Sequence, residues 1–369
     1  MRRSDGLFRW GQLALGAAAL LVAAVPSPAQ VTPAAGYTPP DDTPSIKVGA
    51  TIFADYTYQV EPEISDADGN VVNLNGFNVG RTYINVTGNI SHLLAFRITP
   101  DIVRESGTGS SLSGSLTFRL KYGYAQLNLD DWMPKGSWVR LGIQQTPWVD
   151  FEEGVYRYRF QGTIFADREG YLSSSDAGVS FRTAFPRNYG DVHAGIYNGE
   201  TYTKPEANDQ KAFQIRGTVR PMPAAPTLRA LRFTAFYDAD SYVRDGDRKR
   251  FIAAATFEHK YVNAAAQYLD TKDRTSITRL TVDGTGYSVW VTPKFTRGFE
   301  GLVRYDDLQP DEEVDARRKR TIAGLAYWLP HQGSVSSAVL LDYEQVNNRR
   351  FLPALPEQKR VALHALVNF

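Results

Sequence analysis

The feature that most constrains the fold is an alternation of apolar and polar residues with a period of two. It recurs in sixteen segments of about nine to twelve residues, which is the length of a tilted membrane-spanning strand. The last segment, RVALHALVNF, places Val361, Leu363, Ala365, Val367 and Phe369 on one face. No continuous apolar run long enough for a membrane helix follows residue 29. Any membrane-spanning part of this chain must therefore be a closed barrel, because only closure pairs every strand.

The connections between these segments alternate between short and long. After even-numbered segments they are mostly short, such as ISH and HKY, with PMPAAPTLRA as a longer exception. After odd-numbered segments they are mostly long and polar, such as ESGTGSSLSG, DADSYVRDGDRK and DDLQPDEEVDARRK. The segments begin near Lys47, Phe77, Leu93, Ser115, Trp138, Ala177, Asp191, Ala212, Leu231, Arg250, Val262, Gly286, Glu300, Arg320, Val335 and Arg360.

This rhythm predicts an all-β fold, a transmembrane antiparallel β-barrel of about sixteen strands. Bacterial barrels have short periplasmic turns and long extracellular loops, and an even strand number leaves both termini in the periplasm. A soluble secreted β-sandwich or propeller is the alternative, but it does not account for the rhythm of the connections. Aromatic residues near the short-turn ends predict an interfacial girdle; they are Trp132, Phe185, Tyr261, Phe295, Trp328 and Phe369.

The N-terminus has the features of a secretory signal peptide. Basic residues precede the apolar run LALGAAALLVAAV, and small residues precede a cut after Ala29. We predict a signal peptide at 1–29, a Pro-rich disordered spacer at 30–46 and the barrel at 47–369. An uncleaved membrane anchor is the alternative. The predicted location is the outer membrane of a Gram-negative-type bacterium, with membrane lipids and lipopolysaccharide as neighbours.

The alternation assigns one face of each strand to lipid and the other to the lumen. In one segment Leu116, Phe118, Leu120 and Tyr122 share the apolar parity, with Thr117, Arg119 and Lys121 between them. The predicted pore-lining basic residues are Arg81, Arg97, Arg119, Lys121, Arg140, Arg182, Arg216, Arg304 and Arg360. Arg81, Arg97, Arg119 and Arg140 come from four consecutive strands and predict a wall that attracts anions. The alternative is that these arginines pair with acids and only brace the wall.

The longest connection, 146–176, has little Gly or Pro, so it is unlikely to be structureless. We predict that it folds inward and constricts a water-filled channel. Its charged residues are Asp150, Glu152, Glu153, Arg157 and Arg159. We place the two arginines at or near the constriction, where the acids either brace them or set an opposing field. The alternative is a hairpin that extends above the membrane.

Several other functions lack the residues they need. The chain has no cysteine, and none of its five histidines lies in an HExxH motif or beside a G-x-S-x-G elbow. We therefore expect neither an enzyme nor a metal site or cofactor. The 41 basic and 40 acidic residues nearly cancel, so no overall charge favours nucleic acid. A structural or adhesive barrel and an enzymatic barrel remain the rival classes.

Three stretches resemble the phosphate-selective porin O and P family of outer-membrane porins. They are FNVGRTYINVTGNISHLLAFRITPD, YAQLNLDDWMPKGSWVRLGIQQTPWVDFEEG and YRYRFQGTIFADREGYLSSSDAGVSF. The resemblance implies passive diffusion of small anionic solutes such as phosphate, usually through a homotrimer. It also implies an arginine ladder that includes Arg81, Arg97 and Arg140. Phe369 looks like the terminal signal that the outer-membrane assembly machinery recognises.

Overall fold

The computed structural model describes residues 42–105, 107, 109–331, 333 and 335–369. Its sixteen long strands form one closed antiparallel barrel, in which β1 pairs with β18 to close the ring. The predicted fold class is therefore confirmed. The predicted signal peptide, 1–29, and most of the predicted spacer, 30–46, lie outside the described residues. No described helix is long and apolar enough to cross a membrane, which says nothing about spanning by strands.

The barrel strands follow one another around the ring, and each pairs with its neighbours in sequence. They are β1 (Ser45–Glu61), β4 (Asn75–Asn89), β5 (Leu94–Arg104), β6 (Leu116–Asn128), β7 (Trp138–Gln145), β8 (Ser175–Ala184), β9 (Gly190–Tyr197), β10 (Ala212–Val219), β11 (Leu231–Val243), β12 (Gly246–Glu258), β13 (Val262–Asp273), β14 (Val282–Pro293), β15 (Phe299–Asp311), β16 (Ala316–Leu329), β17 (Ser336–Arg349) and β18 (Gln358–Asn368). A small hairpin, β2 (Ile64–Ser65) and β3 (Val71–Val72), lies between β1 and β4.

Each of the sixteen predicted segments corresponds to one barrel strand, but several strands are longer than predicted. β12, β14 and β16 each begin four residues before the predicted start. The added residues are mostly polar, so alternating hydrophobicity does not reveal them although their backbones pair. Two predicted long connections are therefore wrong: only 244–245 separate β11 from β12, and only 312–315 separate β15 from β16.

A bulge in β6 reverses the predicted orientation of one side chain. Thr99 pairs with Tyr122 and Pro100 pairs with Leu120, so Lys121 has no partner in β5. Proline cannot donate a ladder hydrogen bond and is tolerated in strands at bulges. The extra residue shifts the alternation by one. Tyr122 is therefore only 4% exposed, and the prediction that it shares the outward face of Leu120 is wrong.

The outer face is apolar along most strands, as a lipid-facing surface requires. Phe118 and Leu341 are typical examples, with 68% and 55% of their surface exposed. Trp328, predicted to belong to an interfacial girdle, is instead 5% exposed. On β16 the outward parity belongs to Tyr327 and its alternate neighbours, so Trp328 points into the barrel.

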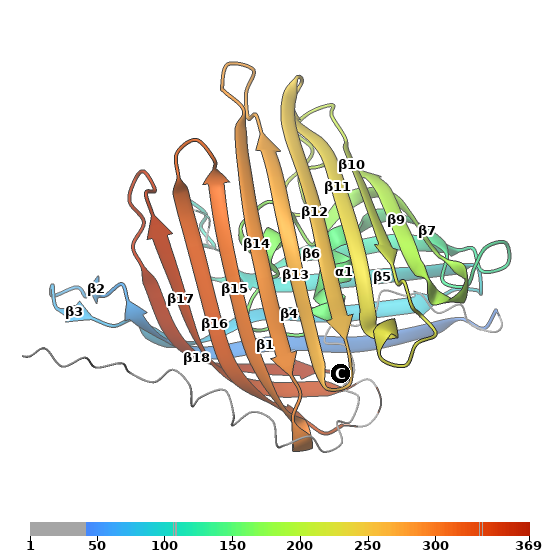
Figure 1. Cartoon of the computed structure of the whole chain (residues 1–369), viewed down its shortest axis with the longest axis horizontal. Coiled ribbons are helices and arrows are strands. Elements are labelled where there is room, and N and C mark those ends of the chain that lie inside the picture. The colour runs from blue at the N-terminus through green and yellow to red at the C-terminus, as the bar shows by residue number, and fades with distance from the viewer. Residues whose placement is uncertain (1–41, 106, 108, 332, 334) are drawn as a thin grey trace, which may run out of the picture.

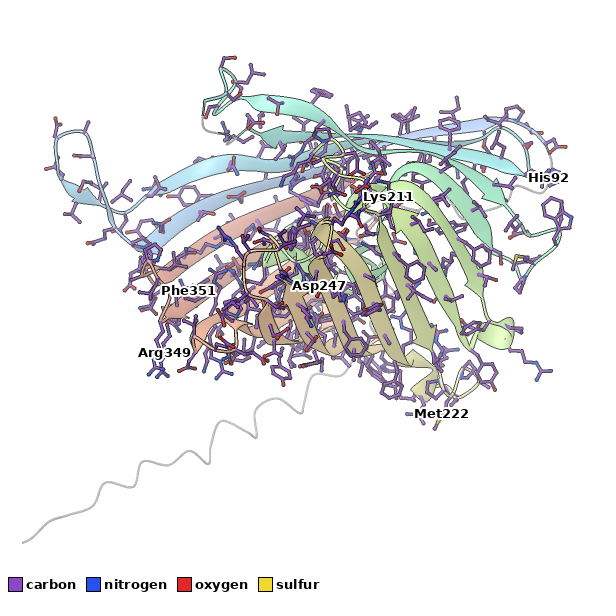
Figure 2. The ribbon with its side chains drawn as sticks, turned by 90° about the horizontal axis from the view of Figure 1, so that it is seen from above. His92, Lys211, Met222, Asp247, Arg349 and Phe351 are labelled. Atoms are coloured by element: carbon purple, nitrogen blue, oxygen red, sulfur yellow. The ribbon has the colours of Figure 1, made fainter. Side chains whose placement is uncertain are left out.

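The two ends of the barrel carry different connections. Figure 2 shows His92 and Met222 on turns at one end, and Arg349 and Phe351 at the other. The connection between β7 and β8, residues 146–174 and here called loop three, carries helices α1 (Pro147–Val155) and α2 (Phe165–Arg168). In Figure 1 α1 lies inside the ring of strands. The buried apolar core is thus inside the barrel, where loop three packs against the wall.

Glycines shape the wall from which loop three departs. Gly142 on β7 faces Tyr124 on one side and Gly178 on the other. Its φ of +127° is unfavourable for other residues, and a Cβ there would lie 2.3 Å from the carbonyl oxygen of Gly123. Close approach of β6 and β7 therefore depends on glycine at this position.

We expect Gly142→Ala to lower the free energy of unfolding by about 1–3 kcal/mol. Both the unfavourable φ and the close contact of the new Cβ with the Gly123 carbonyl oxygen destabilise the folded state. Gly217→Ala is the matched control, since a Cβ at Gly217 meets nothing within 4 Å. Urea unfolding of both variants in detergent, followed by tryptophan fluorescence, measures the difference. Equal stability of the two variants would contradict this account.

Candidate functional site

Loop three packs through its aromatic residues on the strands of the C-terminal half of the barrel. The Tyr156 ring lies 5.2 Å from the Trp290 ring, and Tyr158 and Phe160 lie 5.8 and 6.0 Å from Trp328. All five side chains are at most 5% exposed. Pairs of aromatic rings at these distances stabilise a fold beyond their burial. Loop three is thus held by an apolar core inside the barrel.

Hydrogen bonds fix the same segment in register with the wall. Tyr158 Oη donates to Glu300 Oε2 at 3.0 Å, and Arg304 Nη1 donates to the Thr163 carbonyl oxygen at 2.9 Å. Gln161 Nε2 donates to Asp342 Oδ2 and to a second carboxylate, Glu344 Oε2, both at 2.9 Å. Side chains of β15 and β17 therefore hold the segment from Tyr158 to Thr163 in place.

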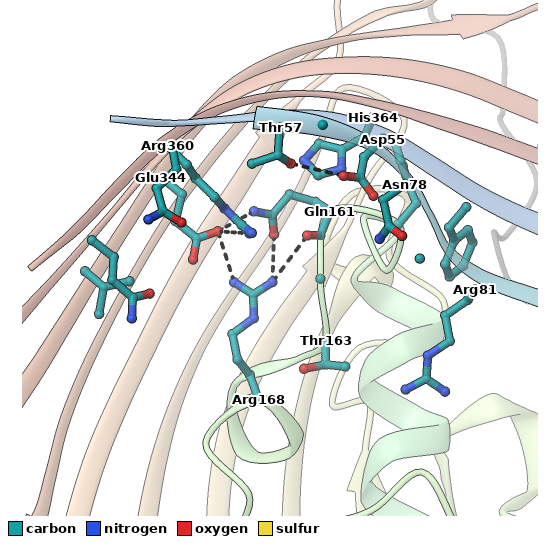
Figure 3. A pocket seen from close by; sticks show the side chains of 18 of the residues that line it. Asp55, Thr57, Asn78, Arg81, Gln161, Thr163, Arg168, Glu344, Arg360 and His364 are labelled. Carbon is teal, nitrogen blue, oxygen red and sulfur yellow. Dashed lines mark hydrogen bonds and ion pairs between the residues drawn. The ribbon is translucent and has the colours of Figure 1, made fainter. Parts of the chain in front are cut away.

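Glu344 on β17 is the centre of an ion-pair network that joins loop three to the wall. Arg360 Nη2 lies 2.6 Å and Arg168 Nη1 3.6 Å from its Oε2 atom, and Arg320 Nη1 bonds to its Oε1 atom. Arg320 also pairs with Glu169 at the end of α2, at 3.2 Å. Three guanidinium groups thus converge on one carboxylate, and Figure 3 shows two of them, those of Arg168 and Arg360.

A cavity of about 690 Å³ separates loop three from the wall made by β1, β4 and β18. Figure 3 shows this space, with Asp55, Arg81 and His364 on the wall and Gln161 and Arg168 on the loop. Its charged lining consists of five arginines and two carboxylates: Arg81, Arg159, Arg168, Arg320, Arg360, Asp55 and Glu344. The charged part of the lining therefore has an excess of positive charge.

Two arginines of the predicted basic wall share one carboxylate. Asp101 Oδ2 lies 2.5 Å from Arg81 Nη1 and 3.3 Å from Arg119 Nε. Tyr202, from the connection between β9 and β10, donates its hydroxyl to the same Oδ2 atom at 3.1 Å. The Arg119 guanidinium lies 5.3 Å from the centre of the Tyr202 ring. Sequence reasoning missed Tyr202; its one signal is an aromatic residue within an otherwise polar connection.

Three other predicted pore-lining basic residues have no carboxylate within 4 Å in the part of the chain that the structure describes. They are Arg97, Lys121 and Arg140, each at most 3% exposed. Arg97 stacks on the Tyr122 ring at 4.5 Å, and Arg140 stacks on the Trp138 ring at 3.7 Å. Neutral oxygens accept hydrogen bonds from them, among them Asn85 Oδ1 from Arg97 and Gln126 Oε1 from Arg140. Aromatic faces and amides thus stabilise these charges where acids are absent.

The remaining predicted wall residues are paired with acids. Arg182 Nε lies 3.1 Å from Asp191 Oδ2, which Arg216 Nη2 also contacts. Arg304 Nη2 lies 2.8 Å from Asp306 Oδ2. Arg182, Arg216 and Arg304 therefore fit the alternative prediction, in which arginines pair with acids and brace the wall.

The predicted charged residues of loop three do not lie together. Arg159 Nε pairs with Glu153 Oε1 at 2.6 Å and lines the cavity. Arg157 does not line that cavity; it stacks on Trp328 at 4.1 Å and lies 3.4 Å from Glu300. Of the three predicted acidic braces, Glu153 contacts Arg159, whereas the carboxylate beside Arg157 is Glu300 of β15.

The other two acids of α1 have separate environments. Glu152 accepts a hydrogen bond from Gln267 Nε2 at 2.5 Å, and burial raises its pKa to about 7. Because the folded state holds this proton more tightly than the unfolded state, the contribution of Glu152 to stability falls as pH rises from about 4.5 to 7. Asp150 lies beside it on the first turn of α1 and is partly exposed.

Phe369 ends the chain on the outer face of the barrel. Its backbone exchanges two hydrogen bonds of 3.0 Å with Ala50 on β1, and its side chain is 58% exposed. The terminal residue therefore helps to close the ring while its ring stays accessible from outside.

No protein-family model matches the chain, and no curated protein is similar to it. Solved outer-membrane proteins are similar in structure. Outer-membrane expressed OmpT of Vibrio cholerae is 14% identical with a TM-score of 0.62, and covers 89% of this chain and 98% of its own. The outer membrane channel DcaP of Acinetobacter baumannii is 12% identical with a TM-score of 0.56, covering 91% and 100%. At these identities the similarity shows the barrel fold alone.

We expect Glu344→Gln to loosen loop three, because three guanidinium groups lose their shared counter-charge. Trypsin should cut the folded barrel after Arg157, Arg159 or Arg168 at least about tenfold faster than it cuts the wild type, since local opening exposes these bonds. Glu357→Gln, which removes a partly exposed carboxylate 3.5 Å from Lys359, is the matched control. Equal resistance of both variants would show that Glu344 does not hold the loop.

Proposed function

We propose that the protein is an outer-membrane porin: a water-filled channel for passive diffusion of small solutes that prefers anions. The observation that carries the proposal is the cavity beside loop three, with five arginines and two carboxylates in its lining. Rings of charged side chains determine ion selectivity in channels by lowering the barrier for ions of opposite sign.

Ion pairs with acids behind the lining offset part of this positive charge: Asp101 pairs with Arg81, Glu153 with Arg159 and Glu169 with Arg320. Positive charge still exceeds negative charge where carboxylates are shared: Arg168 and Arg360 have only Glu344 as a counter-charge within 4 Å among the described residues, and Arg81 and Arg119 share Asp101. Arg360 and Arg119 keep 36% and 34% of their side-chain surface exposed. Guanidinium groups bind carboxylate and phosphate oxygens in a bidentate manner, so small oxyanions such as phosphate are the proposed solutes.

The solved neighbours support the proposed location and class. One is described as an outer membrane channel, and another, OmpT of Vibrio cholerae, was solved in a trimer form. We extend both properties to this chain as part of the proposal: the outer membrane as its location and a homotrimer as its assembly. Phe369 then provides the signal for the assembly machinery. An enzymatic or a structural barrel is the alternative that the same experiment tests.

The test is the reversal potential of single channels in a planar bilayer under a KCl gradient. We expect wild type to favour chloride, and Arg81→Ala/Arg159→Ala to lower the anion-to-cation permeability ratio at least about twofold, since both side chains line the cavity. The matched control, Arg244→Ala/Arg350→Ala, removes two exposed arginines from the long-loop end and should leave the ratio unchanged.

Three results would contradict the proposal in different ways. Cation preference of the wild type would exclude the basic lining as the selectivity element. An equal loss of preference in both double variants would assign selectivity to overall charge. A folded barrel that conducts no ions would favour the enzymatic or structural alternative.

A further inference from the structure

A second basic cavity, of about 600 Å³, lies at the short-turn end of the barrel. Three neighbouring connections form it: 185–189, 220–230 and 259–261. The middle one contains PMPAAPTLRA, the longer exception among the mostly short connections after even-numbered segments. Arg232 and Glu258 have the inward parity of their strands, because Thr234 and Thr256, two residues further into each strand, are buried inside. The cavity therefore opens on the lumen side of the wall.

The charges of this cavity are strongly unbalanced. Its lining has four basic residues, Arg220, Arg229, Arg232 and Lys260, and one carboxylate, Glu258. Glu258 forms an ion pair with Arg232 alone among them. Behind the cavity, Arg182 and Arg216 share the single carboxylate of Asp191. Among the residues that the structure describes here, six basic side chains thus face two carboxylates, Glu258 and Asp191.

Two guanidinium atoms in this cluster lack a partner. The Nε atoms of Arg220 and Arg232 are buried and form no hydrogen bond with the residues that the structure describes. A buried donor without a partner is costly and is usually satisfied by water, an ion or a ligand. The Thr227 hydroxyl and the Asn188 amide add neutral donors to the same lining.

We propose that this cavity, here called the exit site, binds the oxyanion group of a small solute, a phosphate or carboxylate, at the periplasmic mouth of the channel. Arg232 supplies donors from β11 and Arg220 from the residue that follows β10, and Arg229 and Lys260 supply exposed charge from the turns. The space is large enough for an anion that carries more than one charged group. Several cations around one concave site favour multiply charged anions over chloride.

The exit site is separate from the cavity beside loop three, and the two share no lining residue. Each proposal can therefore fail without the other. Binding at the exit site also needs no ion conduction, so it is tested on the folded full chain in detergent without a bilayer.

The test is a titration of folded protein into inorganic pyrophosphate, followed by line broadening of its phosphorus NMR signal. We expect saturable broadening for wild type and a dissociation constant about tenfold higher for Arg229→Gln/Lys260→Gln, because two charge-assisted contacts are lost. Both altered side chains are exposed on turns, so folding should be preserved.

The matched control is Lys47→Gln/Lys135→Gln, which removes two exposed charges from the same end of the barrel but outside the exit site. We expect its dissociation constant to stay within about twofold of wild type. If pyrophosphate binding were weakened equally in both double variants, the effect would come from overall charge and not from the exit site, and the proposal would be overturned. Absence of saturable broadening with folded wild type would overturn it as well.

Discussion

The structure depends on one constraint: in hydrocarbon, every backbone N–H and C=O must find a partner within the protein. Sixteen strands satisfy it by closing into a ring, with β18 paired to β1. A ring of this size is too wide for its own side chains to fill. Loop three occupies part of the interior, and its aromatic residues give the lumen an apolar core. What remains beside the loop is a polar space lined by arginines.

Charge pairing decides how much of the basic lumen can act on a solute. Asp101, Asp191 and Asp306 neutralise arginines that the strand pattern alone would count as free. Net positive charge survives where several guanidiniums share one acid, as around Glu344, or where turns add basic residues, as at the exit site. We therefore propose that anion preference arises at these two cavities and not along a continuous wall.

The sequence predicts the strands well because alternation can be recognised from residue types alone. It predicts the connections poorly where a strand extends with polar residues beyond its alternating segment, as β12 and β16 do. Tyr122 and Trp328 show the limit of such a prediction. A bulge turns Tyr122 into the barrel, and the alternation on β16 places Trp328 on the inner face, although the residue types suit either face. The partners of loop three are also hidden, because Arg157 meets Glu300, a residue on a distant strand. Such contacts depend on how the ring closes, and no local pattern contains that information.

The central claim is that loop three lies inside the barrel, packed against β14–β18, and its most direct test is hydrogen–deuterium exchange of the folded protein. The account requires amides of 147–168 to exchange about as slowly as strand amides, and far more slowly than those of 350–357 between β17 and β18. If 147–168 exchanged as fast as 350–357, loop three would be an open surface loop. The apolar core inside the barrel and the proposed cavity beside it would then both be wrong.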